Sequence, residues 1–106
     1  MHNKFGIRDG ESVWTGSFNL TDTCSYKNPN NAIQVKSKEL AAIYSAEFKE
    51  MFFDRSFGPS SPRHAERQMV KVDDTNIEVF FAPEDNPNAR IAEAISEAEK
   101  EVFFMQ

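Results

Sequence analysis

The sequence predicts an α/β domain in which helices flank a small mixed β-sheet. Short segments in the first twenty residues alternate apolar with polar side chains, which is the period of a half-buried strand. Two longer segments carry apolar residues at intervals of three and four, which is the period of a helix. Strand-like and helix-like segments follow one another along the chain, an order that is typical of layered α/β domains.

The N-terminal segment predicts a β-hairpin followed by a third strand. Apolar and polar residues alternate over residues 5–7 and again over residues 13–17. Asp9-Gly10 between them is a strong signal for a tight turn. Residues 21–31 are polar and rich in turn formers, so we expect a loop there, and a short strand over residues 32–35.

The middle of the chain predicts a helix and then a linker. Ser37 is a typical N-cap residue, and Glu39 in the first turn suits the positive end of a helix. We expect this helix to continue to about Phe53. Its apolar residues are Leu40, Ile43, Tyr44, Phe48, Met51 and Phe52. Residues 54–75 begin with a stretch rich in proline and serine, and we interpret them as a linker.

The remaining residues predict a strand, a helix and a second strand. Residues 76–82 form an apolar run that ends at Pro83. Asn86 is the expected N-cap of the next helix, with Pro87 at its first position, where the missing N–H costs nothing. The apolar stripe of this helix is Ile91, Ile95, Ala98 and Val102. Residues 102–106 are the expected last strand.

Length and composition restrict the class of protein. A chain of 106 residues fits one small domain, and its net charge of −5 argues against a protein that coats nucleic acid by bulk charge. No apolar run approaches the roughly 20 residues of a membrane-spanning helix, and no signal peptide is evident, which favours a cytoplasmic location. Cys24 is the only cysteine, so an internal disulfide or a thiolate metal site is excluded.

Polar residues near the N-terminus follow the pattern H-x-K-x(4)-D-x(6)-G-S-x-N. Its members are His2, Lys4, Asp9, Gly16, Ser17 and Asn19. In a strand, His2 and Lys4 lie on the same face, and the hairpin is expected to bring the five polar side chains together.

This set of side chains suits phosphoryl transfer through a covalent intermediate. A neutral imidazole is a nucleophile toward phosphorus, and a lysine neutralises charge on the non-bridging oxygens. Ser17 and Asn19 can donate further hydrogen bonds to these oxygens, and Gly16 permits a close approach of the backbone. We see no cluster of carboxylates or histidines that would hold a metal, and expect no cofactor.

The pattern resembles the HKD motif of the phospholipase D superfamily in its extended form. The segment NNAIQVKSKELAAIYSAEFKEMF resembles the strand and helix that follow this motif in the superfamily. The segment VFFAPEDNPNARIAEAISEAEKEVFFMQ resembles the opening strand, helix and strand of a phospholipase D-like domain. The resemblance therefore divides the chain into the C-terminal half of one HKD domain (1–53), a linker (54–75) and the start of a following domain (76–106).

The resemblance implies a phosphodiesterase or phosphatidyl transferase that acts on phospholipid or nucleic acid. His2 would be the nucleophile or the acid for the leaving group, Asp9 would orient the site, and Lys4 would bind the phosphate with Ser17 and Asn19. The superfamily pairs two HKD motifs, and His64 does not supply the second, since no lysine follows it at the required spacing.

The second motif would then come from the rest of a longer parent chain or from a second copy. A permuted fold or a domain-swapped homodimer would let residues 76–82 and 102–106 cover the free edge of the hairpin. A catalytically inactive fragment, an association module and a nucleic-acid-binding module with a degenerate site are the alternatives.

Each motif residue also has an ordinary structural interpretation. His2 fits a disordered terminal residue, and Lys4 fits a lysine on an edge strand. Asp9 fits a turn residue with no other role, and Ser17 and Asn19 fit caps at a strand end. All five at these spacings form a specific combination, which favours the functional interpretation.

Other polar residues permit two interpretations each. Tyr26 could line a substrate groove or lie on the surface. Arg63, Arg67 and Lys71 could form a small patch for phosphate-bearing ligands or belong to a solvated linker. Cys24 fits a loop thiol or a buried thiol.

Overall fold

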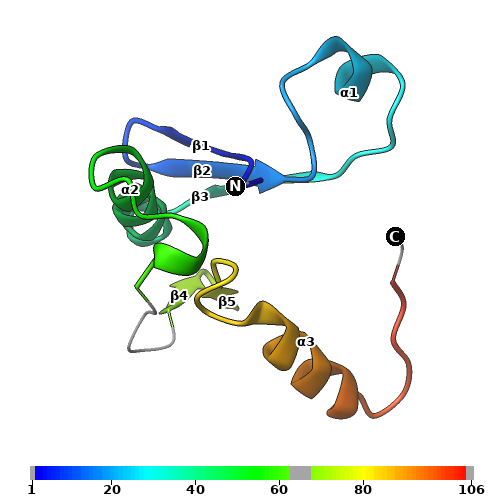
Figure 1. Cartoon of the computed structure of the whole chain (residues 1–106). Helices are drawn as coiled ribbons and strands as arrows, with labels where there is room; N and C mark the ends of the chain where they lie inside the picture. Colours follow the sequence, from blue (N-terminus) through cyan, green and yellow to red (C-terminus); the bar gives the residue numbers. More distant parts are fainter. Residues whose placement is uncertain (1, 63–67, 105–106) are drawn as a thin grey trace.

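The computed structural model describes residues 2–62 and 68–104. The elements in chain order are β1 (Phe5–Arg8), β2 (Ser12–Gly16), α1 (Asp22–Tyr26), β3 (Ala32–Lys36), α2 (Lys38–Phe52), η1 (Gly58–Ser60), β4 (Gln68–Val72), β5 (Thr75–Val79) and α3 (Pro87–Ser96). Figure 1 shows α2 beside the N-terminal sheet, and α3 leads away from that sheet. The predicted α/β class is confirmed.

The N-terminal sheet has the order β1-β2-β3, and both pairings are antiparallel. Phe5 lies opposite Thr15, and Val13 lies opposite Val35. Asp9 and Gly10 have φ of 56° and 65°, in the left-handed region that Asp and Gly tolerate in tight turns. The predicted hairpin, its turn and the third strand are therefore confirmed.

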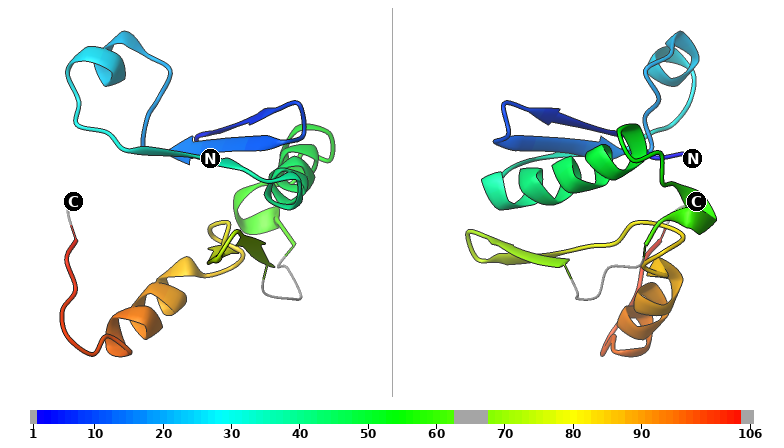
Figure 2. Two further views of the ribbon diagram at one scale, coloured as in Figure 1. Left: turned by 180° about the vertical axis from the view of Figure 1, so that it is seen from behind. Right: turned by 60° about the vertical axis from the view of Figure 1, so that its left-hand side comes forward.

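Helix α2 lies between the N-terminal sheet and the β4-β5 hairpin (Figure 2). Ser37 is its N-cap, and the Ser37 hydroxyl accepts a hydrogen bond from the Leu40 amide at 3.1 Å, as the sequence predicts. The Tyr44 ring makes edge contacts with Phe5 and Phe81, with centroids 5.1 and 5.3 Å apart. The buried core consists of Val13, Leu40, Ala41, Val70, Val79 and Phe81.

The second sheet corrects the predicted linker. Strand β4 lies inside residues 54–75, and β5 pairs antiparallel with β4 instead of joining the N-terminal sheet. Val70 and Val79 are buried on the side of this hairpin that joins the core, and Asp73, with φ of 52°, forms the turn. The described strands thus form two antiparallel sheets rather than one mixed sheet. They do so because a local hairpin closes at a smaller entropic cost than a pairing with the distant β1 edge.

Two more expectations for helices need correction. The predicted loop at residues 21–31 contains the short helix α1, because the Thr21 hydroxyl caps it by accepting a hydrogen bond from the Cys24 amide at 3.3 Å. Asn86 holds the N-cap position and Pro87 begins α3 as expected, but Asn86 has a left-handed backbone (φ 49°) and its side chain makes no capping hydrogen bond.

The C-terminal segment is more open than the sequence suggests. Helix α3 has no buried residue, and the ion pair between Arg90 Nε and Glu78 Oε2, at 2.7 Å, joins it to β5. The predicted strand at 102–106 is not formed over residues 102–104, where Phe103 and Phe104 are exposed, and residues 105–106 lie outside the described part. Among the described helices, none has both the length and the apolar character needed to cross a bilayer.

Gly16 allows β2 and β3 to come unusually close. A Cβ atom at Gly16 would lie 2.7 Å from the Cα of Ala32 and would also collide with the carbonyl oxygen of Asn31. Just beyond, the Ser17 amide donates to that same carbonyl oxygen at 2.9 Å. The glycine of the motif is therefore required by the contact between two strands of this chain.

We expect Gly16→Ala to lower the free energy of unfolding by about 1–3 kcal/mol, since backbone atoms must move to admit the methyl group. Gly6→Ala is the matched control in the same sheet, because a Cβ at Gly6 would meet no atom within 4 Å. Urea denaturation of both variants measures the difference. Equal losses in the two variants would contradict the close approach at Gly16.

Candidate functional site

The H-x-K part of the motif lies directly before β1. The Lys4 ammonium donates to the carbonyl oxygen of His2 at 2.6 Å. The Thr15 hydroxyl donates to the carbonyl oxygen of Lys4 at 3.0 Å, which ties the segment to β2. His2 is exposed and Lys4 is half-buried, so the imidazole is open to a ligand while the lysine stem rests on protein.

The G-S-x-N part lies at the same end of the hairpin. Because Phe5 pairs with Thr15, continuing the register sets Lys4 opposite Gly16 and Asn3 opposite Ser17. The Ser17 hydroxyl accepts from the Asn31 amide at 3.0 Å and is 3.3 Å from Asn30 Oδ1. The hydroxyl is thus held in place at an exposed position.

Asn19 lies two residues further on and is half-buried. Its side-chain amide donates to the sulfur of Cys24, with a distance of 3.2 Å between Nδ2 and Sγ. This hydrogen bond is the first cause that lowers the pKa of the Cys24 thiol from 9.0 to about 7, because an N–H that points at sulfur favours the thiolate.

Asp9 is not brought to this end of the hairpin. It lies in the turn beyond Arg8, five residues from Lys4, which corresponds to about 16 Å along a strand. Its side chain is exposed and lies 3.9 Å from the Arg8 guanidinium. The expected meeting of all five polar side chains in one place is therefore wrong for Asp9. The register brings the H-x-K segment and the G-S-x-N segment to the same strand end, where Ser17 follows β2 and lies opposite Asn3.

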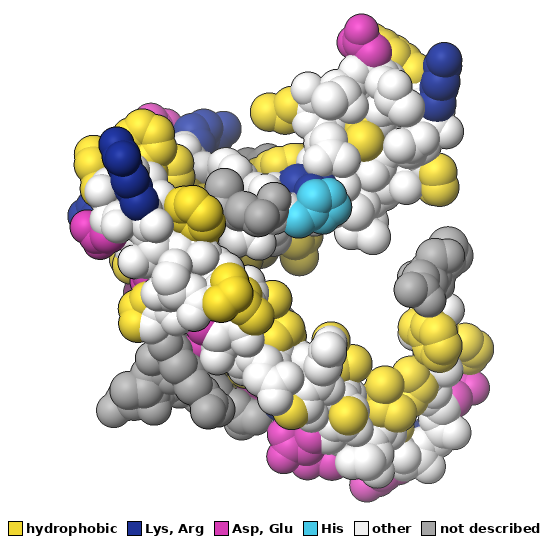
Figure 3. All heavy atoms as spheres, in the orientation of Figure 1, with side chains coloured by type: hydrophobic (Ala, Val, Ile, Leu, Met, Phe, Trp, Pro, Cys, Tyr) yellow, Lys and Arg dark blue, Asp and Glu magenta, His cyan; other side chains and the backbone are white. Residues whose placement is uncertain are grey.

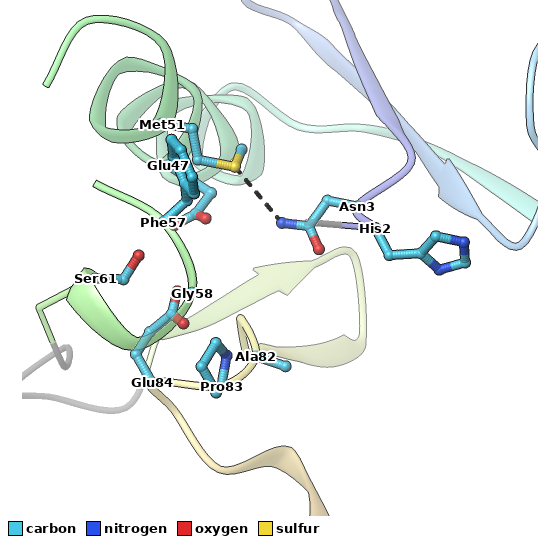
Figure 4. A pocket seen from close by; sticks show the side chains of 10 residues that line it. All are labelled: His2, Asn3, Glu47, Met51, Phe57, Gly58, Ser61, Ala82, Pro83 and Glu84. Carbon is cyan, nitrogen blue, oxygen red and sulfur yellow. Dashed lines mark hydrogen bonds between the residues drawn. The ribbon is translucent and has the colours of Figure 1, made fainter. Parts of the chain in front are cut away.

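A small cleft opens beside the H-x-K segment, with a volume of about 160 Å³. Its walls come from the N-terminal segment, α2, the η1 region and the turn after β5, and the residues are His2, Asn3, Glu47, Met51, Phe57, Gly58, Ser61, Ala82, Pro83 and Glu84. Figure 4 shows the His2 ring directed away from the cleft, whereas Asn3 points toward Met51. The imidazole thus lies on the outer side of the cleft rim.

Two carboxylates that the motif does not include, those of Glu47 and Glu84, also line this cleft. Glu47 is 2% exposed, and its position on α2 is three residues after Tyr44 and seven after Leu40. That spacing puts a charged residue on the apolar side of the helix. A charge at such a position is the sequence feature that could have indicated a buried carboxylate here. The structure brings it near the H-x-K segment.

The other polar residues do not join this site. Tyr26 is 84% exposed at the end of α1. Lys71 is exposed on β4, and Arg63 and Arg67 lie outside the described residues, so the predicted basic patch stays a prediction. In the part of the chain that the structure describes, no three His, Cys, Asp or Glu side chains are grouped as metal ligands would be.

Comparison with known proteins identifies the N-terminal half. Residues 1–52 match the family model described as cardiolipin synthase, PLD-like domain. The matched segment contains the complete pattern from His2 to Asn19 and extends to the end of α2. No curated protein and no solved structure matches the chain.

Substitutions of Asp9 can distinguish a structural role in the turn from a role in binding at the site. Asn tolerates the left-handed backbone as Asp does, so Asp9→Asn should preserve the free energy of unfolding within about 0.5 kcal/mol. Asp9→Val should lower it by about 1–2 kcal/mol, because a β-branched side chain is strained there. Urea denaturation measures both effects.

From the same geometry, we expect Asp9→Asn to bind inorganic phosphate as the wild-type chain does, measured by isothermal titration calorimetry. A folded Asp9→Asn variant with weakened phosphate binding would instead show that the carboxylate serves the site, as the motif resemblance implies.

Proposed function

Residues 1–52 belong to the phospholipase D superfamily, and we propose on this premise that they supply one half of a phosphodiesterase or phosphatidyl transferase active site. The observation that carries the proposal is the hairpin register, which pairs Phe5 with Thr15 and so brings the segment before β1 and the end of β2, with the two parts of the motif, to one strand end. The substrate class is a phosphodiester, either a phospholipid or a nucleic acid.

The first chemical step is an attack by His2 on phosphorus. A nitrogen of the neutral imidazole forms a P–N bond as the P–O bond to the leaving group breaks, and a second histidine gives its proton to the departing oxygen. Water or an alcohol then attacks the phosphohistidine and gives its proton to the second histidine, the P–N bond breaks, and the neutral imidazole of His2 is released. Hydrolysis yields a monoester, whereas transfer to an alcohol yields a new diester.

Lys4, Ser17 and Asn19 stabilise the charge that develops on the non-bridging oxygens. The Lys4 ammonium supplies a full positive charge, and the serine hydroxyl and asparagine amide supply neutral donors. The held position of the Asn19 amide supports the proposal, since its second hydrogen is preorganised for the developing charge. The Ser17 hydroxyl has one hydrogen and turns it from Asn30 Oδ1 to the phosphate oxygen on binding. Ser17 is held by Asn31 and Asn19 is held by Cys24.

The second histidine is proposed to come from a second HKD motif. In this proposal residues 76–106 open a following phospholipase D-like domain, and the partner motif lies in the remainder of a parent chain or in a second copy. Strands β1 and β3 have free edges in the described N-terminal sheet, and Phe52 and Phe53 are 65% and 68% exposed at the end of α2. Both features favour association.

The alternatives are an inactive fragment, an association module and a nucleic-acid-binding module. The net charge of −5 weighs against tight nucleic-acid binding, and the intact motif weighs against a degenerate site. The exposed apolar side chains of α3 and the segment after it suit an association module (Figure 3). Activity of the chain on a diester distinguishes these alternatives from the proposed enzyme.

We expect His2→Ala to abolish hydrolysis of a chromogenic phosphodiester, while a chelator leaves the wild-type rate unchanged, because the nucleophile is a side chain and the charge is neutralised by Lys4. His64→Ala is the control, with folding checked by circular dichroism. A rate that a chelator removes and that His2→Ala does not change would refute the phosphohistidine mechanism.

Association is tested separately. If two copies complete the paired site, sedimentation equilibrium should show a homodimer at micromolar concentration, and the specific rate of hydrolysis should fall on dilution below the dissociation constant. A stable monomer that hydrolyses diesters at full rate would contradict the paired site.

A further inference from the structure

The segment from Asn19 to Asn31, called here the α1 loop, is organised around one buried thiol. Cys24 is 6% exposed and lies in helix α1. Its sulfur accepts from the Asn19 amide at 3.2 Å and, at a longer 3.8 Å, from the Asn28 amide. Figure 1 shows this loop extending from the end of the N-terminal sheet, and the two contacts join residues within it.

The backbone of Cys24 reaches the second donor of the motif. The Asn30 amide donates to the Cys24 carbonyl oxygen at 3.0 Å, and the Ser17 hydroxyl donates to Asn30 Oδ1 at 3.3 Å. Asn19 is therefore connected to Cys24 directly, and Ser17 is connected through Asn30. Cys24 thus holds Asn19 directly, and it adds an indirect contact to Ser17, which Asn31 also holds.

We propose that Cys24 is the positioning residue of the phosphate-binding arm, an inference that rests on the proposed function of Ser17 and Asn19. A side-chain amide has two hydrogens. The Cys24 sulfur takes one hydrogen of Asn19 and thereby fixes the direction of the other, which remains for a phosphate oxygen. An amide without this contact would rotate and lose part of its preorganisation.

The pKa of the Cys24 thiol is shifted in the direction that such a contact produces. Its pKa is lowered to about 7, first because of the hydrogen bond from Asn19. The charged side chains of the α1 loop are Asp22 and Lys27, and both are exposed. The backbone N–H of Asn19 and the side chains of Thr21 and Asn28 lower the pKa further, and burial opposes them. The Asn19 side chain is the largest of these causes, so its removal should raise the pKa of Cys24 even when no substrate is present.

The first experiment titrates Cys24 by the ultraviolet absorbance of its thiolate. Cys24 is the only cysteine, so the Cys24→Ser variant supplies the blank. We expect a midpoint near pH 7 in the wild-type chain and a midpoint shifted toward the usual 9.0 in Asn19→Ala. Asn28→Ala is the matched control, with the same amide chemistry at a longer distance, and should shift the midpoint less. A wild-type midpoint near 9.0, or no change in Asn19→Ala, overturns the proposal.

The second experiment measures the affinity for inorganic phosphate by isothermal titration calorimetry. We expect Cys24→Ala to weaken binding about five- to tenfold, the usual worth of one hydrogen bond, and Cys24→Ser to recover most of it because a hydroxyl also accepts. Tighter binding in Cys24→Ala would overturn the proposal, since the sulfur would then compete with phosphate for Asn19.

The two experiments also distinguish the two proposals. A thiol midpoint that responds to Asn19→Ala, together with no phosphate binding by the wild-type chain, would refute the proposed function and leave the contact intact. Phosphate binding with an unperturbed thiol would refute the role of Cys24 and leave the proposed function in place.

Discussion

The close contact between the end of β2 and the start of β3 is the constraint on which the candidate site depends. Gly16 admits the backbone of Asn31 and Ala32, and Ser17 then exchanges two hydrogen bonds with Asn31. This contact closes the base of the α1 loop. It fixes the serine of the motif directly and, through Asn30 and Cys24, determines where the asparagine lies.

The core and the site use different parts of the same sheet. Val13 packs toward α2, and the aromatic chain of Phe5, Tyr44 and Phe81 continues this core toward the second hairpin. The motif residues instead lie at the strand end. Because the core is not built from them, exchanges of His2 or Lys4 should test chemistry with little effect on folding.

The sequence predicted the local elements well and their pairing less well. The Asp9-Gly10 turn, the Ser37 cap and the period of α2 depend on short-range rules, and all three were confirmed. The β4 strand was missed although Val70 and Val72 alternate with polar residues before a turn at Asp73. A composition of proline and serine just before it led to the interpretation as a linker.

For the site, the sequence revealed the types of residue but not where each would lie. The hairpin register could be inferred from the turn, and it already implies that Asp9 lies far from Lys4. The role of Cys24 could not be inferred, because it depends on how a polar loop folds back on itself. Glu47 was detectable only as a charge on the apolar side of a helix. Contacts that depend on how an irregular loop or a buried charge is placed in space leave little trace in a single sequence.

The central claim is that His2, Lys4, Ser17 and Asn19 bind one phosphate group together. Nuclear magnetic resonance of the isotope-labelled chain during titration with inorganic phosphate tests it most directly. We expect the signals of these four residues to shift with one common binding curve while the Asp9 signal stays unchanged. Shifts scattered over the surface, or confined to residues outside these four, would contradict it.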